Sequence, residues 1–133
     1  MTIEEAIHQR WAASTDLNNL PSAERLFTGR AHGGSLPYAT LVRESSRPVC
    51  RTSGGDVEEV ALRIYVWHDD YEAGQAIVRR AEAVFGRCSF ALGDGGRVSS
   101  MRPGRRTDRQ HEDGRWQFTL RFLAQVFYPK EPQ

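Results

Sequence analysis

The sequence has little cysteine. Only Cys50 and Cys88 occur among 133 residues, far apart, with no CxxC pair and no histidine at ligand spacing. Structural zinc sites and disulfide frameworks use closely spaced or more numerous cysteines, so we expect neither. An unpaired cysteine commonly packs as a small hydrophobic residue. We therefore interpret both side chains as buried thiols.

An excess of charge is also missing. Eighteen basic and seventeen acidic residues give a formal net charge of +1, which produces no overall field for nucleic acid or an anionic membrane. No apolar run approaches the length of a membrane-spanning helix. The N-terminus, MTIEEAIHQR, is acidic and amphipathic, unlike a signal peptide. We expect one soluble intracellular domain, residues 1–133, without a membrane partner.

Catalytic motifs are absent as well. There is no glycine-rich phosphate loop, no GxSxG, and no cysteine placed with a histidine. The nearest candidate for metal or acid-base chemistry is His68-Asp69-Asp70, but neighbouring side chains at the end of a strand diverge. Asp69 is expected to cap a helix instead. The sequence predicts no catalytic residue, no metal, no cofactor and no enzyme activity.

The strongest pattern that is present runs from Val57 to Gly86. Apolar and polar residues alternate over 60–67, which predicts a half-buried strand with Val60, Leu62, Ile64 and Val66 on the core side. From Tyr71 the apolar spacing becomes that of an amphipathic helix. Asp69 is predicted to cap its start, and Gly86 to end it in the left-handed conformation.

The remaining elements follow from shorter patterns. A helix is predicted over 2–13 with Thr2 as its cap, and a long final strand over 115–128. A polar break covers 16–24 and a glycine-rich loop 29–37. Gly54-Gly55 and Gly93–Gly96 are read as turns. Short strands are predicted at 24–29, 37–45, 48–53, 88–92 and 97–102.

This order of elements predicts an α+β domain. Antiparallel strands in succession, with one helix before them and one among them, are typical of a single sheet with both helices packed on one face. The apolar face of the final strand, from Trp116 to Tyr128, provides the surface on which the helices would pack.

The opposite face of the predicted sheet is less polar than a solvated face. It carries Tyr65, Trp67, Leu123 and Phe127 among polar and charged residues. Two interpretations stay open, namely scattered surface residues and a subunit interface. If the second is right, Trp67→Ala weakens assembly and leaves the monomer folded.

Arginine is concentrated between the last two strands. Residues 101–115, MRPGRRTDRQHEDGR, include Arg102, Arg105, Arg106 and Arg109, and lack an aromatic residue. One interpretation is a solvated hairpin tip. The other is a partner-binding arm that pairs with acidic surface or phosphate. For the second we expect residues 103–113 to be mobile, to project from the sheet and to become ordered on a partner.

Three stretches carry a resemblance to a known family. They are RLFTGRAHGGSLPYATL, the strand and helix VEEVALRIYVWHDDYEAGQAIVRRAEAVF, and the final strand WQFTLRFLAQVFYP. Together with the N-terminal helix, they resemble the tail-completion (tail terminator) proteins of long-tailed bacteriophages and prophages. The resemblance covers nearly the whole chain, and its motifs are structural.

The resemblance implies a structural protein without a cofactor. Such proteins form a homohexameric ring that stops growth of the tail tube and docks it on the head. The implied partners are other copies of the chain, the tail tube protein and head-tail connector proteins, with DNA in the ring lumen a further possible contact. The implied location is the bacterial cytoplasm during assembly and then the virion tail. The alternatives are a small ligand- or nucleic-acid-binding module and an unrecognised enzyme.

Overall fold

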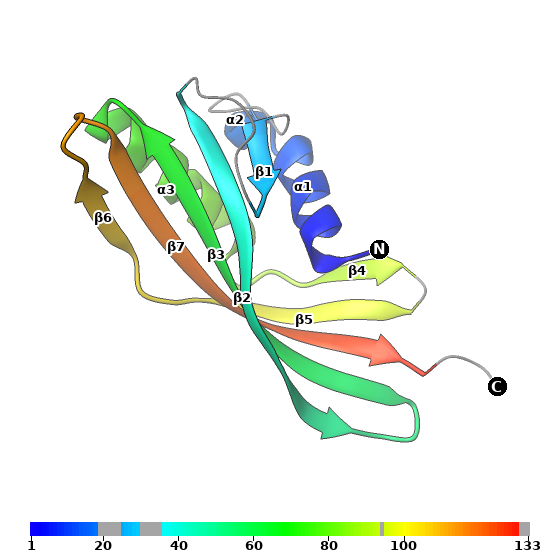
Figure 1. Cartoon of the computed structure of the whole chain (residues 1–133). Coiled ribbons are helices and arrows are strands. Elements are labelled where there is room, and N and C mark those ends of the chain that lie inside the picture. Colours follow the sequence, from blue (N-terminus) through cyan, green and yellow to red (C-terminus); the bar gives the residue numbers. More distant parts are fainter. Residues whose placement is uncertain (19–24, 30–35, 94, 131–133) are drawn as a thin grey trace.

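The computed structural model describes residues 1–18, 25–29, 36–93 and 95–130. These residues form a curled seven-stranded sheet and three helices (Figure 1). Most of the glycine-rich loop, most of the polar break and part of the turn at 93–96 lie outside the described residues. The helices are α1 (Ile3–Ala13), α2 (Thr15–Asn18) and α3 (Tyr71–Phe85). The strands are β1 (Leu26–Thr28), β2 (Tyr38–Arg51), β3 (Gly55–His68), β4 (Phe90–Gly93), β5 (Gly96–Pro103), β6 (Thr107–Gln110) and β7 (Trp116–Pro129).

The sheet is built around the pair β3 and β7. Its strand order is β1-β2-β3-β7-β5-β4, and β6 pairs with β7 as well. β1 and β2 are parallel, and every other pair is antiparallel. β3 and β7 stay in register without a bulge from Gly55 opposite Pro129 to His68 opposite Trp116. The predicted α+β class and the central position of the last strand are consistent with this topology.

The core lies on the face that the alternation predicts. Val60, Leu62, Ile64 and Val66 of β3 are buried, and so are the alternate residues of β7 from Phe118 to Val126. α3 contacts β3, β7 and β5, and lies behind the strands in the view of Figure 1. Its buried residues include Gly74, Ile77 and Phe85.

Both ends of α3 fall where the sequence predicts, but the residues that form them differ. The N-cap is Asp70, whose carboxylate accepts a hydrogen bond from the Ala73 amide at 2.9 Å, and not Asp69. The left-handed residue after the helix is Arg87, with φ 61°, whereas Gly86 has φ −66°. Both corrections are shifts of one residue, since a cap pattern fixes a helix end only to within a position or two.

α1 begins at the predicted cap, because the Thr2 hydroxyl accepts a hydrogen bond from the Glu5 amide at 3.1 Å. It packs against α2 and α3. The Trp11 ring lies 6.4 Å from that of Phe85 on α3. The expected count of two helices was too low, since Thr15–Asn18, which overlaps the start of the predicted polar break, forms α2, with Leu17 buried.

The two strands predicted at 37–45 and 48–53 are one strand, β2, which follows β3 through two register shifts. Residues 43–51 of β2 are exposed, and Cys50 among them is not the buried thiol we expected. Its side chain lies near the turn at 52–55 on the face of the sheet opposite the core, which we call the open face. Pro48 and the arginines of this segment are features by which exposed strands avoid pairing with other chains. Cys88 packs against the core, and burial raises the pKa of its thiol.

The basic segment is more ordered than expected. Residues 107–110 form β6, which pairs with β7 from Thr107 opposite Thr119 to Gln110 opposite Trp116. The expectation of a mobile arm over 103–113 is therefore wrong for this part. The reason is that β7 extends beyond the end of β5, so its edge is free to pair with the returning chain.

Gly74 fixes how closely α3 approaches the sheet. A Cβ atom at this position would overlap the Phe118 ring of β7, within 3.0 Å of three of its atoms. We predict that Gly74→Ala lowers the free energy of unfolding by about 1–3 kcal/mol, because overpacking forces the helix away from β7. Urea denaturation followed by circular dichroism measures this.

The control is a second change that removes the overlap. The double variant Gly74→Ala with Phe118→Leu should lose less stability than the sum of the two single variants. A Gly74→Ala protein as stable as the wild type would show that α3 does not pack on Phe118 in this way.

Candidate interaction surfaces

The four predicted interface residues lie on the open face of the sheet in two separate places. The first is formed by Tyr65 and Trp67, and the second by Leu123 and Phe127. Tyr65 and Trp67 are near the end of β3 and pair with Thr119 and Gln117 of β7. Leu123 and Phe127 lie further along β7, four or more residues beyond Thr119. At about 3.3 Å per residue, this separates them from the first pair by about 13 Å or more. All four are partly buried in the single chain. The structure therefore brings them to one face but not into one patch.

Trp67 is covered by its own chain. Its ring stacks on Tyr38 with centroids 6.1 Å apart, and the His111 ring lies 5.1 Å away. The Arg115 guanidinium is 5.2 Å from the centroid of the Trp67 ring. His111 in turn is hydrogen-bonded to Gln117 at 2.9 Å. The turn between β6 and β7 thus shields part of the indole, which the alternation of residues along β3 does not reveal.

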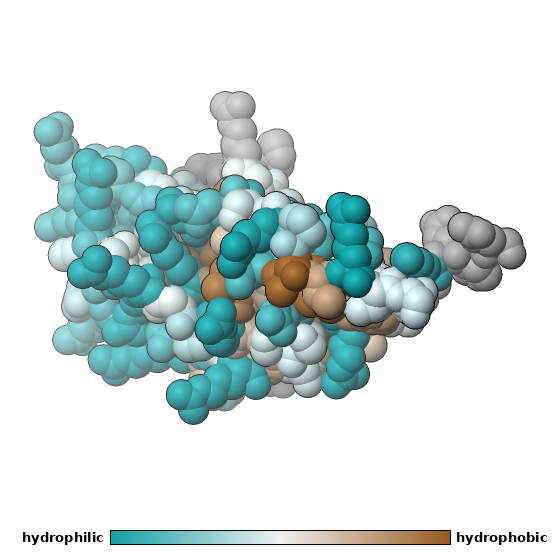
Figure 2. Space-filling view, turned by 90° about the horizontal axis from the view of Figure 1, so that it is seen from below, coloured by the Kyte–Doolittle hydropathy of each residue, from teal (hydrophilic) through white to brown (hydrophobic). Residues whose placement is uncertain are grey.

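The second place is more apolar. Phe127 pairs with Val57 and Leu123 pairs with Ala61 across the β3–β7 ladder, on the open face. The β2–β3 hairpin continues this end of the sheet and carries Val49, whose exposed fraction is 49%. Figure 2 shows a small hydrophobic area ringed by hydrophilic residues on the side that faces down in Figure 1.

Two arginines lie between the Tyr65–Trp67 place and the Leu123–Phe127 place on the open face. Arg63 and Arg121 pair directly across β3 and β7, and like charges in that position repel. Glu44 forms an ion pair with Arg63, which also donates to the Tyr65 hydroxyl at 3.2 Å. These contacts raise the pKa of Arg63. The centre of the open face is therefore polar and basic.

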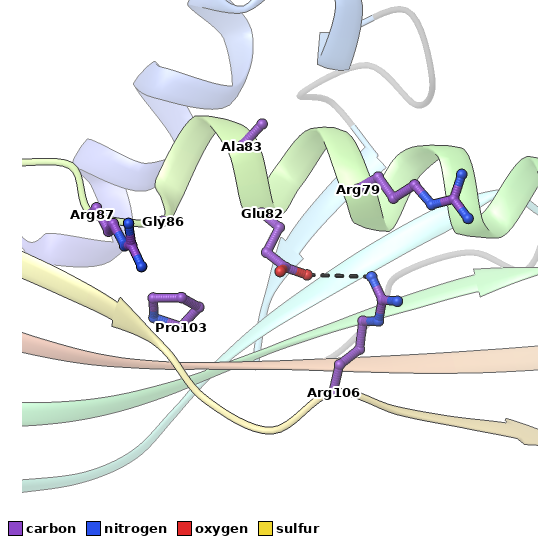
Figure 3. A pocket seen from close by; sticks show the side chains of 7 residues that line it. All are labelled: Arg79, Glu82, Ala83, Gly86, Arg87, Pro103 and Arg106. Atoms are coloured by element: carbon purple, nitrogen blue, oxygen red, sulfur yellow. Dashed lines mark hydrogen bonds and ion pairs between the residues drawn. The ribbon is translucent and has the colours of Figure 1, made fainter.

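The four predicted partner-binding arginines point to different sides of the molecule. Arg102 of β5 and Arg109 of β6 lie on the open face, and Arg102 is 3.9 Å from Glu59. Arg105 is exposed in the connection between these strands. Arg106, also in the connection, turns toward α3 and pairs with Glu82 at 3.3 Å, beside a cleft (Figure 3). They do not form one basic arm.

A polar clamp that the sequence did not predict joins β6 to α3. Asp108 accepts hydrogen bonds from the buried Gln75 amide at 2.8 Å and from the Tyr71 hydroxyl at 3.3 Å. Gln75 also donates to the Tyr71 oxygen at 2.8 Å. The signal in the sequence was the polar Gln75 on the otherwise apolar, core-facing side of α3. The clamp ties the helix-facing side of β6 to α3.

His68, Asp69 and Asp70 serve local structure. The His68 Nδ1 atom accepts from the Asp70 amide at 2.9 Å and lies 3.0 Å from Asp69. Among the described residues, no group of three histidine, cysteine or acidic side chains is arranged to hold a metal ion. No helix in the same part of the chain is long and apolar enough to cross a membrane.

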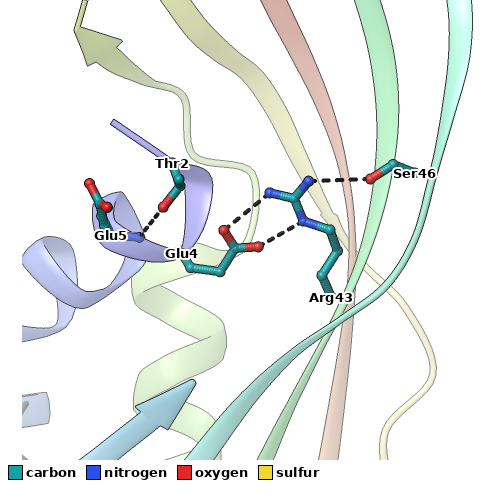
Figure 4. Close-up of polar contacts among 5 residues, drawn as sticks. All are labelled: Thr2, Glu4, Glu5, Arg43 and Ser46. Carbon is teal, nitrogen blue, oxygen red and sulfur yellow. Dashed lines mark hydrogen bonds and ion pairs between the residues drawn. The ribbon is translucent and has the colours of Figure 1, made fainter. Parts of the chain in front are cut away.

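An ion pair fastens α1 to the long strand β2. The Arg43 guanidinium binds both carboxylate oxygens of Glu4, at 2.7 and 3.1 Å, and reaches Ser46 at 3.4 Å (Figure 4). Burial alone would raise the pKa of Glu4, but the hydrogen bonds and charge of Arg43, a backbone hydrogen bond and the Thr2 hydroxyl together outweigh it, and the pKa is lowered. The pair stabilises the contact between the helix and the half of β2 that carries no other strand on its outer edge.

Comparison with solved structures shows the class of fold. A chain from a structure described as "Virion of native gene transfer agent (GTA) particle" superimposes with a TM-score of 0.74 at 17% identity, covering 95% of each chain. At this identity the likeness concerns the fold. A search of the curated proteins finds no match.

The family assignment rests on the sequence of almost the whole chain. The family described as "Tail completion protein gp17" matches residues 5–126, and the chain belongs to it. The protein is thus a structural protein of the phage tail and not an enzyme, as the sequence predicted.

We predict that the Glu4–Arg43 pair makes stability depend on acid pH. A lowered pKa in the folded state stabilises the protein above the usual value of 4.5, and this contribution disappears as pH falls through the folded value. Glu4→Gln should lower the free energy of unfolding by about 1 kcal/mol at pH 7, and by less at pH 3. Denaturant titrations at several pH values measure the difference.

Glu5 provides the matched control, because it lies in the same turn of α1 and is exposed. Glu5→Gln should leave the stability almost unchanged at either pH. A Glu4→Gln protein whose deficit is the same at pH 3 and pH 7 would show that the carboxylate charge contributes nothing.

Proposed function

We propose that the chain forms a homohexameric ring that caps the tail tube and joins it to the head. Membership of the tail-completion family is the observation that carries this proposal. The likeness to a chain of a gene transfer agent virion over 95% of both chains supports a place in a particle of this kind. In this account the chain assembles in the bacterial cytoplasm and ends in the virion tail.

The open face of the sheet is the proposed subunit interface. α3 packs on the other face and α1 packs on α3, so this face is left for a neighbour, and it carries Tyr65, Trp67, Leu123 and Phe127. Aromatic residues are enriched at subunit interfaces, with polar groups around them. Arg63 is already paired with Glu44, and Arg121 lies opposite it between the two apolar places, so a neighbouring copy would have to supply an acidic group for Arg121.

The exposed arginines are proposed to face the next proteins in the stack. Arg102, Arg105 and Arg109 are accessible in the single chain, and guanidinium groups bind carboxylates through paired hydrogen bonds. The tail tube protein and the head-tail connector proteins are the proposed partners. A rotationally closed ring leaves two different end surfaces, so it can bind both.

We predict that polar substitutions at the apolar end of the open face prevent ring formation. Leu123→Ser with Phe127→Ser should weaken subunit association by at least about 2 kcal/mol, because both side chains would lose a packed interface. Light scattering after size-exclusion chromatography should show a hexamer for the wild type and smaller species for the variant.

Ala76→Ser is the matched control, since Ala76 is exposed on α3 and away from the open face. Its hexamer should be unchanged. If the Leu123 and Phe127 variant remains hexameric, or if the wild type is a monomer at high concentration, the proposed interface is wrong.

Trp67 distinguishes a contact made within the chain from one made between chains. Since the indole already packs on Tyr38 and His111, Trp67→Ala should cost the monomer about 1 kcal/mol and weaken the ring further. Unfolding of the isolated subunit by this change would assign Trp67 wholly to the fold.

A further inference from the structure

A basic cleft lies between the C-terminal end of α3 and the connection from β5 to β6. It has a volume of about 400 Å³. Figure 3 shows Arg106 rising from the connection toward Glu82 on the helix, with Arg79 earlier on the helix and Arg87 just beyond its end. Ala83, Gly86 and Pro103 complete the lining. Three arginines and one glutamate thus line the cleft, and Arg106 pairs with the glutamate.

We propose that this cleft binds an acidic peptide segment of a partner protein. Arginine binds carboxylates through paired, charge-assisted hydrogen bonds, and its charge is permanent. Glu82 forms an ion pair with Arg106, with 3.3 Å between the nearest oxygen and nitrogen. Two further guanidinium groups line the same cleft, so it carries a net positive charge, and its apolar lining can pack against a peptide backbone.

The backbone at Arg87 supports a binding role. Its φ of 61° lies in the left-handed region, where glycine is favoured and other residues are strained. The conformation is held by a hydrogen bond from the Arg87 amide to the Met101 carbonyl at 2.6 Å. A turn at this position would form more readily with glycine. The strained residue therefore places a guanidinium at the cleft, and strain of this kind is characteristic of functional sites.

The chemistry favours carboxylates over nucleic acid. A DNA backbone is contacted through a row of cations that neutralise several phosphates, whereas this cleft is short and its arginines are gathered around one end of α3. Aromatic side chains on which bases stack are also absent from its lining. The site lies on the helix side of the molecule, away from the open face, so the proposal does not depend on ring formation.

The test is to titrate the full chain with an end-blocked hexaglutamate peptide and to measure the affinity by isothermal titration calorimetry. Arg87→Gly and Arg106→Gln should each weaken binding about tenfold. Arg97→Gln is the matched control, because Arg97 lies on the open face, and it should leave the affinity unchanged. Hexaglutamine, of the same length without charge, should not bind.

Two variants should show effects that a structural role does not predict. Arg87→Gly should raise the midpoint of thermal unfolding while weakening binding, because glycine relieves the left-handed strain. Glu82→Gln should tighten binding several-fold, because it frees Arg106 and removes a competing carboxylate. If both arginine variants bind hexaglutamate as the wild type does, the assignment fails. It also fails if a short DNA duplex or inorganic phosphate binds at least as tightly as the peptide.

Discussion

The pairing of β3 with β7 is the constraint on which the rest of the structure depends. Fourteen residues of each strand stay in register, so the two apolar faces form one continuous surface and the two open faces another. A slip of one residue would exchange these faces. The position of α3 follows from this register, because Gly74 allows the helix to approach Phe118 closely. The separation of the open face into two apolar places with arginines between them follows from it as well.

The long-range features of the fold could be predicted where periodicity is strong. The alternation from Val60 to Val66 identified the core face of β3, and the spacing of apolar residues gave the bounds of α3. The corrections concern the helix ends, where single hydrogen bonds decide which residue forms the cap. Asp70 caps the helix instead of Asp69, and Arg87 takes the left-handed conformation. The strand β6 could not be predicted, because residues 107–110 have no apolar alternation and pair only because β7 presents a free edge.

The sequence predicts which residues belong to the interaction surfaces, but not how these residues are arranged in space. Sequence alternation placed Tyr65, Trp67, Leu123 and Phe127 on one face, yet their separation along β7 and the cover over Trp67 depend on tertiary structure. The arginines of 101–115 appeared as one basic segment. Strand pairing sends Arg102 and Arg109 to the open face and Arg106 to the helix side. A single run of charge therefore contributes to two different surfaces, which suits a subunit that contacts more than one neighbour.

The most direct measurement of the central claim is a cryo-electron microscopy reconstruction of the assembled protein. The account predicts a closed sixfold ring in which the open face of each sheet, including Leu123 and Phe127, is buried against the next copy. It also predicts that the clefts lined by Arg79, Arg87 and Arg106 remain accessible from outside the subunit contacts. A ring whose subunits meet through the helices, with the open face in solvent, would contradict the account.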